Sequence, residues 1–250
     1  MQPIWACFWA LVWSAQSMTV GAGPMPVDVV TASWQGYAVD EAEQGYYLAL
    51  LERVFPAEDW TLRVHFLPFA RTLYMLDRQR ADIVLSVYRG DLGSGLYSED
   101  WVEVEAIDAA VAPGLAANWQ GVASLKAKKV RAMKGYRYDS LTKIAMDYQE
   151  GSSLLDMLNL LNAGSIDAVL DYRVEIRRLS RQLKRPQAYV LIPDVLRAEV
   201  YFGFADNAKG RMLKAHFDLQ HKALIASGER AALFDAWQQK LSQRLAVEQN

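Results

Sequence analysis

The chain of 250 residues is 52% hydrophobic and 22% charged, and it carries a net charge of -2. This composition is typical of a folded protein and excludes intrinsic disorder, and the small net charge gives no overall field that attracts nucleic acid or acidic lipid. The length allows one large domain or two small ones. Eight tryptophans and twelve tyrosines suit a core, and they also suit a ligand cleft, where flat rings give a large contact area.

The amino-terminal segment differs from the rest. Residues 4–15 form an apolar run of the length of a signal-peptide core, too short to span a bilayer. With Val20 and Ala22 at the critical positions, we expect residues 1–22 to be a signal peptide; a buried helix or an anchor is the alternative, since no Lys or Arg precedes the run. The single cysteine, Cys7, lies within it, so the mature chain would hold no disulfide, thiolate metal site or cysteine nucleophile. No later stretch is apolar enough to span a membrane, so we expect a soluble mature protein.

The first part of the chain predicts a β-α-β-α-β order, which implies a parallel sheet. The signals are Val-rich strand runs, alternating apolar residues, and helices that start near Gly45 and Pro68. The predicted elements are strand 27–32, helix 45–55, strand 62–66, helix 68–79 and strand 82–88.

The rest of the chain predicts a second set of elements. Residues 101–112 read as an extended segment that crosses between two lobes, and Asp139 or Ser140 suits the cap of a helix. The remaining predicted elements are a short helix at 125–127, strand 129–133, a tight loop at 134–136, an apolar-faced helix at 154–161, strand 167–171, a basic helix at 172–183, strands 188–192 and 199–204, and two helices after Lys209 that are broken near Gly228.

Two strand-like runs end in charged residues of opposite sign. Arg89 follows strand 82–88, and Asp171 follows the run 166–170. In open α/β sheets, ligands bind outside the carboxyl ends of strands. The two runs therefore predict two lobes that face a polar ligand.

The order of local motifs resembles the family 3 extracellular solute-binding proteins, the periplasmic receptors of amino-acid ABC importers. The motifs extend over about residues 27–241; they are Gly45-Tyr46, the entry Arg80-Ala81-Asp82-Ile83, Gly95-Leu96-Tyr97-Ser98, residues 124–130 with Gly135, Asn162-Ala163-Gly164-Ser165-Ile166-Asp167-Ala168-Val169, and Gly203-Phe204-Ala205 with Gly228 and Trp237. The resemblance implies a type II fold of two α/β lobes joined by two crossover strands. It implies that residues 27–105 and 201–250 form lobe 1 and that 106–200 form lobe 2. The lobes would close over a ligand by a hinge motion.

The resemblance implies roles for the two charged residues. Arg89 would grip a ligand carboxylate, because guanidinium pairs with both oxygens; the alternative is a solvated loop residue paired with Asp91. The family's arginine sits several residues further on, so this spacing departs from its pattern. Asp171 would accept hydrogen bonds from a ligand ammonium, or would instead cap the following helix.

Several other residues near the expected cleft are candidates for ligand contact. Aromatic side chains there can stack on a ligand or cover a cation, although each can equally be packing. Arg71 at a helix start could reach an acidic ligand or lie on the surface, and Arg137 with Asp139 flanks a glycine loop at a helix N-terminus, where anions are favoured. The aromatic candidates are Trp34, Tyr37, Tyr88 and Tyr136.

The leading function is a periplasmic binding protein that captures an amino acid or related solute for the permease of an ABC importer. The alternatives are an enzyme on the same fold, such as a dehydratase or lyase using Asp171 or Glu99, and a ligand-binding partner of a membrane sensor. We expect a monomer without cofactor, metal or nucleic-acid partner. The three histidines, His65, His216 and His221, are too scattered for a metal pair, and no hydrolase elbow or phosphate loop is present.

Overall fold

The structure, a computed structural model, describes residues 23–34, 37–39 and 45–247. In this part of the chain nine strands form one sheet in the order β2-β1-β3-β9-β5-β8-β6-β7, with the short β4 paired to β9. The strands are β1 Met25–Thr31, β2 Trp60–Phe66, β3 Ile83–Val87, β4 Leu96–Tyr97, β5 Glu103–Val111, β6 Lys129–Met133, β7 Asp147–Gly151, β8 Ala168–Asp171 and β9 Val190–Phe204.

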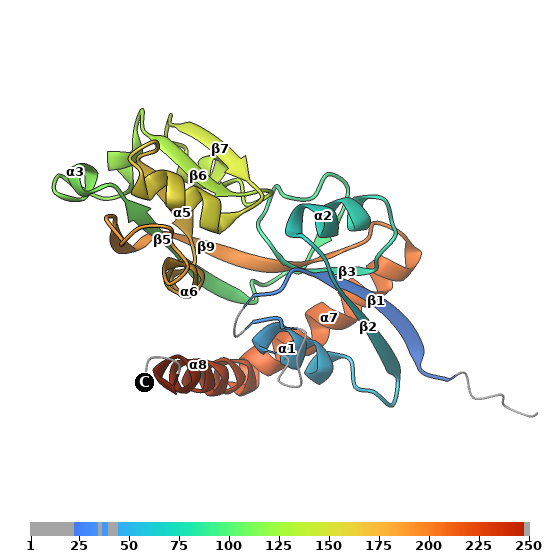
Figure 1. The fold of residues 1–250 in the computed structure, drawn as a ribbon. Helices are drawn as coiled ribbons and strands as arrows, with labels where there is room; N and C mark the ends of the chain where they lie inside the picture. Colours follow the sequence, from blue (N-terminus) through green and yellow to red (C-terminus); the bar gives the residue numbers. More distant parts are fainter. Residues whose placement is uncertain (1–22, 35–36, 40–44, 248–250) are drawn as a thin grey trace, which may run out of the picture.

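Two long antiparallel strands, β5 and β9, run through the whole molecule (Figure 1). The end of β9 pairs with β3, while its beginning pairs only with β5, which in turn pairs with β8. On one side, β1, β2 and β3 are mutually parallel; on the other, β6, β7 and β8 are parallel. The strands thus form two parallel halves, here called the first and second lobe, joined by β5 and β9. The exact boundaries at 105/106 and 200/201 stay a prediction.

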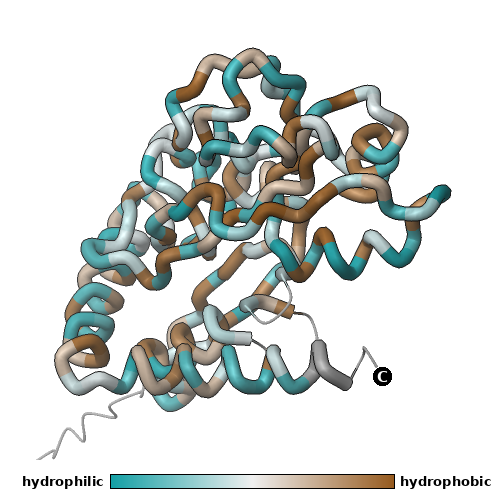
Figure 2. The backbone as a smooth tube through the Cα atoms, turned by 90° about the vertical axis from the view of Figure 1, so that its left-hand side faces the viewer, coloured by the Kyte–Doolittle hydropathy of each residue, from teal (hydrophilic) through white to brown (hydrophobic). Residues whose placement is uncertain are grey.

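The helices cover the two lobes separately. The first lobe carries α1 Tyr46–Val54, α2 Phe69–Asp77, α7 Ala208–Ser227 and α8 Glu229–Val247, and the second carries α3 Pro113–Ala116, the 3₁₀ helix η1 Val122–Leu125, α4 Tyr138–Thr142, α5 Leu154–Asn162 and α6 Arg173–Ser180. Hydrophilic and hydrophobic residues alternate along the long C-terminal helices, as their colouring in Figure 2 shows. No helix in the described residues is long and apolar enough to cross a membrane.

The predicted apolar stripe of 154–161 lies in the core of the second lobe. Leu154, Leu158 and Leu161 of α5 are buried and pack with Val169 of β8 and Ile176 of α6. Full burial of one such side chain contributes about 1.5–3 kcal/mol. The main core cluster extends across both lobes and contains the buried residues of β1, β3 and the end of β9.

Two predicted segments differ in the structure. The helix expected from Asp139 or Ser140 is only the short α4, which begins after Arg137 in a left-handed conformation (φ 48°), and the chain then continues into β7. β7 is an exposed edge strand, so its polar sequence gives no burial pattern that would have identified it. The predicted signal peptide lies outside the described residues.

The strands expected at 188–192 and 199–204 are one continuous strand, β9. The break in the sequence, Pro193-Asp194, coincides with an irregularity in pairing between Ile107 and Ala109 of β5, and Asp194 has a φ of 51°. Proline cannot donate to the ladder, and a bulge accommodates it without ending the strand. The turn-like signal therefore marks a bend in a crossover strand.

Candidate functional site

The carboxyl ends of β1, β3, β6 and β8 meet between the lobes, and each is followed by an aromatic residue. In chain order these are Trp34, Tyr88, Tyr136 and Tyr172, of which the first three are buried. Trp34 Nε1 donates a hydrogen bond to Tyr136 Oη at 3.0 Å. Three of the four predicted aromatic candidates therefore come together at the lobe junction. With Phe69 and Tyr138, these four residues are called the interlobe aromatic cluster.

The rings of this cluster are closely packed. Phe69, at the start of α2, lies 5.6 Å from the Trp34 ring and 5.8 Å from the Tyr136 ring, both in edge-on contact. Tyr136 contacts Tyr138 at 5.4 Å. Gly135 makes this approach possible, because its φ is +95° and a Cβ there would lie 3.2 Å from the Phe69 ring. The aromatic residues thus fill the space directly between the strand ends.

Glu105 on β5 is hydrogen-bonded to two members of the interlobe aromatic cluster, one from each lobe. Glu105 is buried, and its Oε2 accepts hydrogen bonds from Tyr88 of the first lobe at 2.7 Å and from Tyr172 of the second lobe at 2.6 Å. Ser86 donates to its Oε1 from β3, at a residue in a left-handed conformation where the pairing of β3 shifts. Glu105 is therefore a hydrogen-bonded link between the two lobes.

A second glutamate, Glu103, lies on the same face of β5, because side chains two apart in a strand share a face. It is 5% exposed, whereas Val104 between the two glutamates is 43% exposed. The Tyr47 hydroxyl lies 2.9 Å from Glu103 Oε2 and 2.9 Å from Glu105 Oε1. A hydroxyl has one proton, so it can donate to one carboxylate at a time. The second contact requires a proton on one of the carboxyl groups.

The electrostatics agree with this shared proton. Burial and the neighbouring Glu105 raise the pKa of Glu103 to about 8. Burial also raises the pKa of Glu105, although four hydroxyl groups donate to it and oppose the change. Two carboxyl groups so close in a dry site do not both ionise readily.

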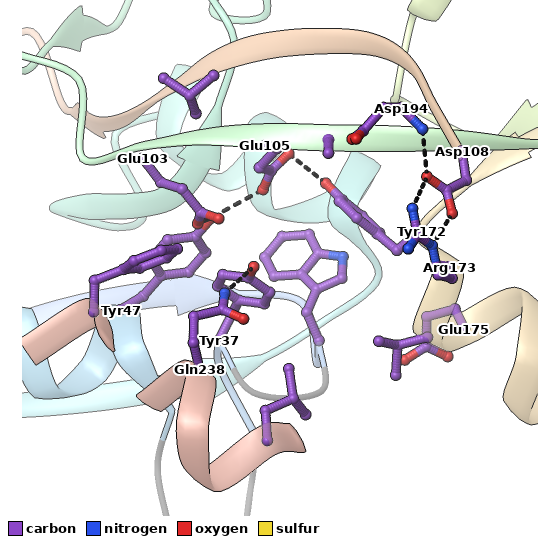
Figure 3. A pocket seen from close by; sticks show the side chains of 16 residues that line it. Tyr37, Tyr47, Glu103, Glu105, Asp108, Tyr172, Arg173, Glu175, Asp194 and Gln238 are labelled. Carbon is purple, nitrogen blue, oxygen red and sulfur yellow. Dashed lines mark hydrogen bonds and ion pairs between the residues drawn. The ribbon is translucent and has the colours of Figure 1, made fainter. Parts of the chain in front are cut away.

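A cavity of about 380 Å³ opens beside this glutamate pair (Figure 3). Both lobes line it, together with β5: the first lobe supplies Tyr37, Tyr47 and Gln238, and the second supplies Tyr172 and Arg173. The volume falls in the range of small-molecule sites. The lining residues are Trp34, Tyr37, Tyr47, Glu103, Val104, Glu105, Ala106, Asp108, Tyr172, Arg173, Val174, Glu175, Asp194, Phe234, Gln238 and Leu241.

An ion pair forms part of the cavity lining. Arg173, at the start of α6, donates to both oxygens of the buried Asp108, with its Nη2 at 3.2 Å from Oδ1. The backbone N–H of Asp194 donates to the same Oδ1 at 2.9 Å. Two further lining residues are bonded to each other: Gln238 of α8 donates to the Tyr37 hydroxyl at 3.2 Å. These polar groups of the lining are thus held in place by their neighbours.

Asp171 is buried at the end of β8 and does not line the cavity. Its Oδ1 accepts the backbone N–H of Tyr172 at 2.7 Å, and its Oδ2 has no partner among the described residues. The buried Tyr138 hydroxyl also lacks a described partner. Burial raises the pKa of Asp171 to about 8. A polar ligand group or a proton would satisfy it.

The predicted arginines lie outside the cavity. Arg89 is exposed; its guanidinium stacks 4.1 Å from the Tyr201 ring centre, and Asp91, its expected alternative partner, instead accepts the Tyr88 N–H. Arg71 is exposed on α2. Arg137 is exposed and donates to the Gly90 carbonyl at 2.8 Å, a contact between the lobes. Their ligand-binding roles stay predictions.

The remaining candidates, Glu99 and the three histidines, do not line the cavity. Glu99 is exposed, and its backbone N–H donates to Asp218. His65 lies 3.5 Å from Asp28, His216 contacts the Val54 carbonyl at 2.9 Å, and His221 is buried without a described hydrogen-bond partner. The described part of the chain contains no group of three or more His, Cys, Asp or Glu residues suited to a metal ion.

The residues that dominate the site are not among those predicted from the sequence: Tyr47, Glu103, Glu105, Asp108 and Tyr172. A signal was present in residues 103–106, Glu-Val-Glu-Ala, which alternate acidic and apolar side chains. Such alternation ordinarily indicates that the charged side faces solvent. Here the acidic side faces inward, because tyrosine hydroxyls from both lobes surround it.

Comparison with known proteins establishes the fold. The ligand-binding core of GluR0 in complex with L-glutamate has a TM-score of 0.66 at 16% identity, covering 87% of this chain and 99% of that one. A probable amino-acid ABC transporter extracellular-binding protein, ytmK from Bacillus subtilis, has a TM-score of 0.62 at 17% identity, covering 86% and 97%. AncCDT-1, an ancestral amino-acid-binding protein and precursor of cyclohexadienyl dehydratase, has 0.63 at 13%, covering 86% and 95%.

No protein-family model matches the chain, and a sequence search of curated proteins gives no match. The solved structures nevertheless show that the chain has the two-lobed type II fold of periplasmic binding proteins, as the sequence predicts. The solved structures that share this fold include amino-acid-binding proteins of ABC transporters.

Proposed function

We propose that this chain is an exported solute-binding protein of the family 3 type, which captures a small polar solute between its lobes for an ABC importer. The observation that carries the proposal is the cavity of about 380 Å³ whose walls come from both lobes and from β5. A solute there contacts all three parts at once. Relative movement of the lobes would therefore open or close its access.

Lobe closure supplies the mechanism. Two hydrogen bonds join the lobes, from Trp34 to Tyr136 and from Tyr172 to Glu105, and both would break when the lobes separate. A solute shifts the equilibrium toward this closed form by its differential affinity for it. A permease would then recognise the surface of the closed form. The lobes that move would meet at the boundaries 105/106 and 200/201.

A thermal-shift screen tests solute binding directly. Amines, amino acids and small carboxylates are each added to the purified mature chain, and a binding compound raises the melting temperature by mass action. Small-angle X-ray scattering of the same mixture should show a smaller radius of gyration when the compound closes the lobes. Absence of a shift with every class would contradict the proposal.

An enzyme on the same fold is the second candidate. The buried Asp171, with a pKa raised to about 8, has the protonation behaviour of a general acid. Mass spectrometry of a bound compound after long incubation separates the two: recovery of the unchanged compound supports binding, and a new product supports catalysis. A sensor partner would bind in the same way, and capture on the membrane receptor rather than on a permease would identify it.

Export is tested separately. Residues 1–30 are fused to a reporter enzyme that is active only outside the cytoplasm, and we expect activity. A fusion that starts at residue 23 is the control and should be inactive. Mass measurement of the exported chain should place the new amino terminus at Gly23.

A further inference from the structure

We infer that the cavity beside Glu103 and Glu105 selects an organic cation without a carboxylate, such as an alkylamine or alkylguanidine, whose charged head lies against the two carboxyl groups. The inference rests on the proposed function, since it names the solute class for the same cavity. Three observations carry it: the charges on the wall, the aromatic lining, and the shared hydroxyl between the glutamates.

The charges that line the cavity are predominantly negative. Five acidic residues and one basic residue face it, and the basic one, Arg173, is paired with Asp108. Among the ion pairs of the described residues, none includes Glu103 or Glu105. Buried charges are normally paired. A cationic ligand would provide the missing partner.

Aromatic side chains form the rest of the wall. Trp34, Tyr37, Tyr47, Tyr172 and Phe234 all line the cavity. Tyr37 and Tyr47 are in ring contact at 5.2 Å, next to the glutamates. The negative face of an aromatic ring attracts a cation, and several rings together recognise alkylated ammonium groups. The apolar lining also suits the methylene chain of such a ligand.

The shared hydroxyl shows what a cation would replace. Tyr47 contacts both glutamates with one proton, so this geometry requires a further proton on the carboxyl pair. A bound cation would neutralise the pair in place of that proton and release it. The titratable and charged groups that face the pair are Tyr37 after β1, Tyr47 of α1, Tyr88 after β3, Tyr172 after β8 and Arg230 of α8.

Among the described residues that line the cavity, no basic side chain is free to pair with a carboxylate, because Arg173 is bound to Asp108. Arg71 and Arg89 are exposed and do not line the cavity, and Arg137 donates to Gly90. A ligand carboxylate inside would therefore face the two glutamates without a compensating guanidinium. It would pay both desolvation and repulsion.

Matched ligand pairs test the inference. Agmatine is compared with arginine, and cadaverine with lysine, because each pair differs by one carboxylate; glutamate is the anionic control. We expect agmatine and cadaverine to bind at least about tenfold more tightly than their amino-acid counterparts, the ratio that 1.4 kcal/mol of lost interaction produces. Tighter binding of arginine, lysine or glutamate would overturn the inference and leave the proposed function standing. No binding in any class would contradict both.

A variant and a proton count complete the test. Glu103→Gln keeps the shape of the side chain and should weaken agmatine by about tenfold or more, whereas Glu58→Gln, an exposed residue outside the cavity, should leave the affinity unchanged. Titration calorimetry of the unaltered protein at pH 7, in two buffers of different ionisation enthalpy, should show proton release on binding. Equal heats in the two buffers, or equal affinity of Glu103→Gln and the unaltered protein, would overturn the inference; the calorimetry stays informative if the variant does not fold.

Discussion

Trp34 Nε1 donates to Tyr136 Oη at 3.0 Å, although the two residues are 102 positions apart in the sequence. Trp34 follows β1 of the first lobe, and Tyr136 follows β6 of the second. Both are mostly buried, at 7% and 9% exposure. The bond therefore lies inside the junction of the lobes, where water cannot readily replace it while the lobes are closed.

The first prediction concerns this bond. Tyr136→Phe leaves the Trp34 N–H without its acceptor in a buried place, which should cost the closed form about 1–3 kcal/mol. Opening restores contact with water, so the population of the open form should rise. The radius of gyration from small-angle X-ray scattering should increase without ligand. Tyr74→Phe, at an exposed tyrosine of α2, is the control; equal scattering from both variants would show that the bond does not hold the lobes.

The second prediction concerns stability against pH. Burial raises the pKa of Asp171 in the folded chain to about 8 from its ordinary value of 3.8. Between these values the unfolded carboxyl is ionised while the folded one keeps its proton, so the folded state binds more protons. Stability is therefore lost as pH rises, by up to about 1.4 kcal/mol per pH unit from this group.

The free energy of urea unfolding should be measured from pH 6.5 to about pH 8. Burial lowers the pKa of His221 to about 4 from 6.5, and this gives an opposite slope that fades as pH rises above 6.5. Asp171→Asn, which keeps an acceptor for the Tyr172 N–H, should flatten the fall in urea-unfolding free energy. Part of the slope should remain, because Glu103 titrates in the same window. Asp139→Asn, at an exposed position, should retain the original slope; a parallel curve for Asp171→Asn would refute the assignment.

The third prediction concerns Gly45, which precedes α1. Its φ is +85°, and a Cβ there would lie 2.4 Å from the carbonyl of Tyr37, a wall residue of the cavity. A strained backbone alone costs about 1–3 kcal/mol. Gly45→Ala should destabilise the fold by more than this, because the added Cβ also meets the Tyr37 carbonyl. Urea unfolding measures this loss. Gly114→Ala, where nothing lies within 4 Å of the added atom, should change the unfolding free energy little; similar losses in both would show that the contact relaxes.

Much of the fold follows from local patterns in the sequence. The apolar runs at 27–32 and 82–88 become β1 and β3, and the stripe of 154–161 becomes the buried face of α5. These segments satisfy their own periodicity and burial at the same time, which makes them predictable. The edge strand β7 and the bend in β9 depend on neighbours that the local sequence does not specify.

The site was harder to predict because its determinants are not local. Residues 103–106 alternate like a solvated strand, and the acidic face is buried only because Tyr47, Tyr88 and Tyr172 from three distant segments cover it. Trp34 and Tyr136 could be predicted as cleft residues because they follow strands whose carboxyl ends meet. The partners of a charged side chain after a strand depend on its rotamer and on the register of the strand. Neither can be read from the position of Arg89 in the sequence.

The fourth prediction concerns Arg89, for which the family resemblance implies a carboxylate ligand. In the structure its guanidinium stacks on Tyr201 at 4.1 Å and donates to the Glu99 carbonyl at 3.4 Å, and it does not line the cavity. Because an exposed stack of this kind contributes about 0.5–1 kcal/mol, Arg89→Ala should lower the unfolding free energy by that amount. The affinity for the best ligand of the thermal-shift screen should stay within about twofold, since less than 0.4 kcal/mol of binding energy is then involved. Arg89→Lys, which keeps the charge, is the matched control: if the alanine variant loses carboxylate binding and the lysine variant retains part of it, Arg89 reaches the ligand in solution and the stack on Tyr201 must open to allow it.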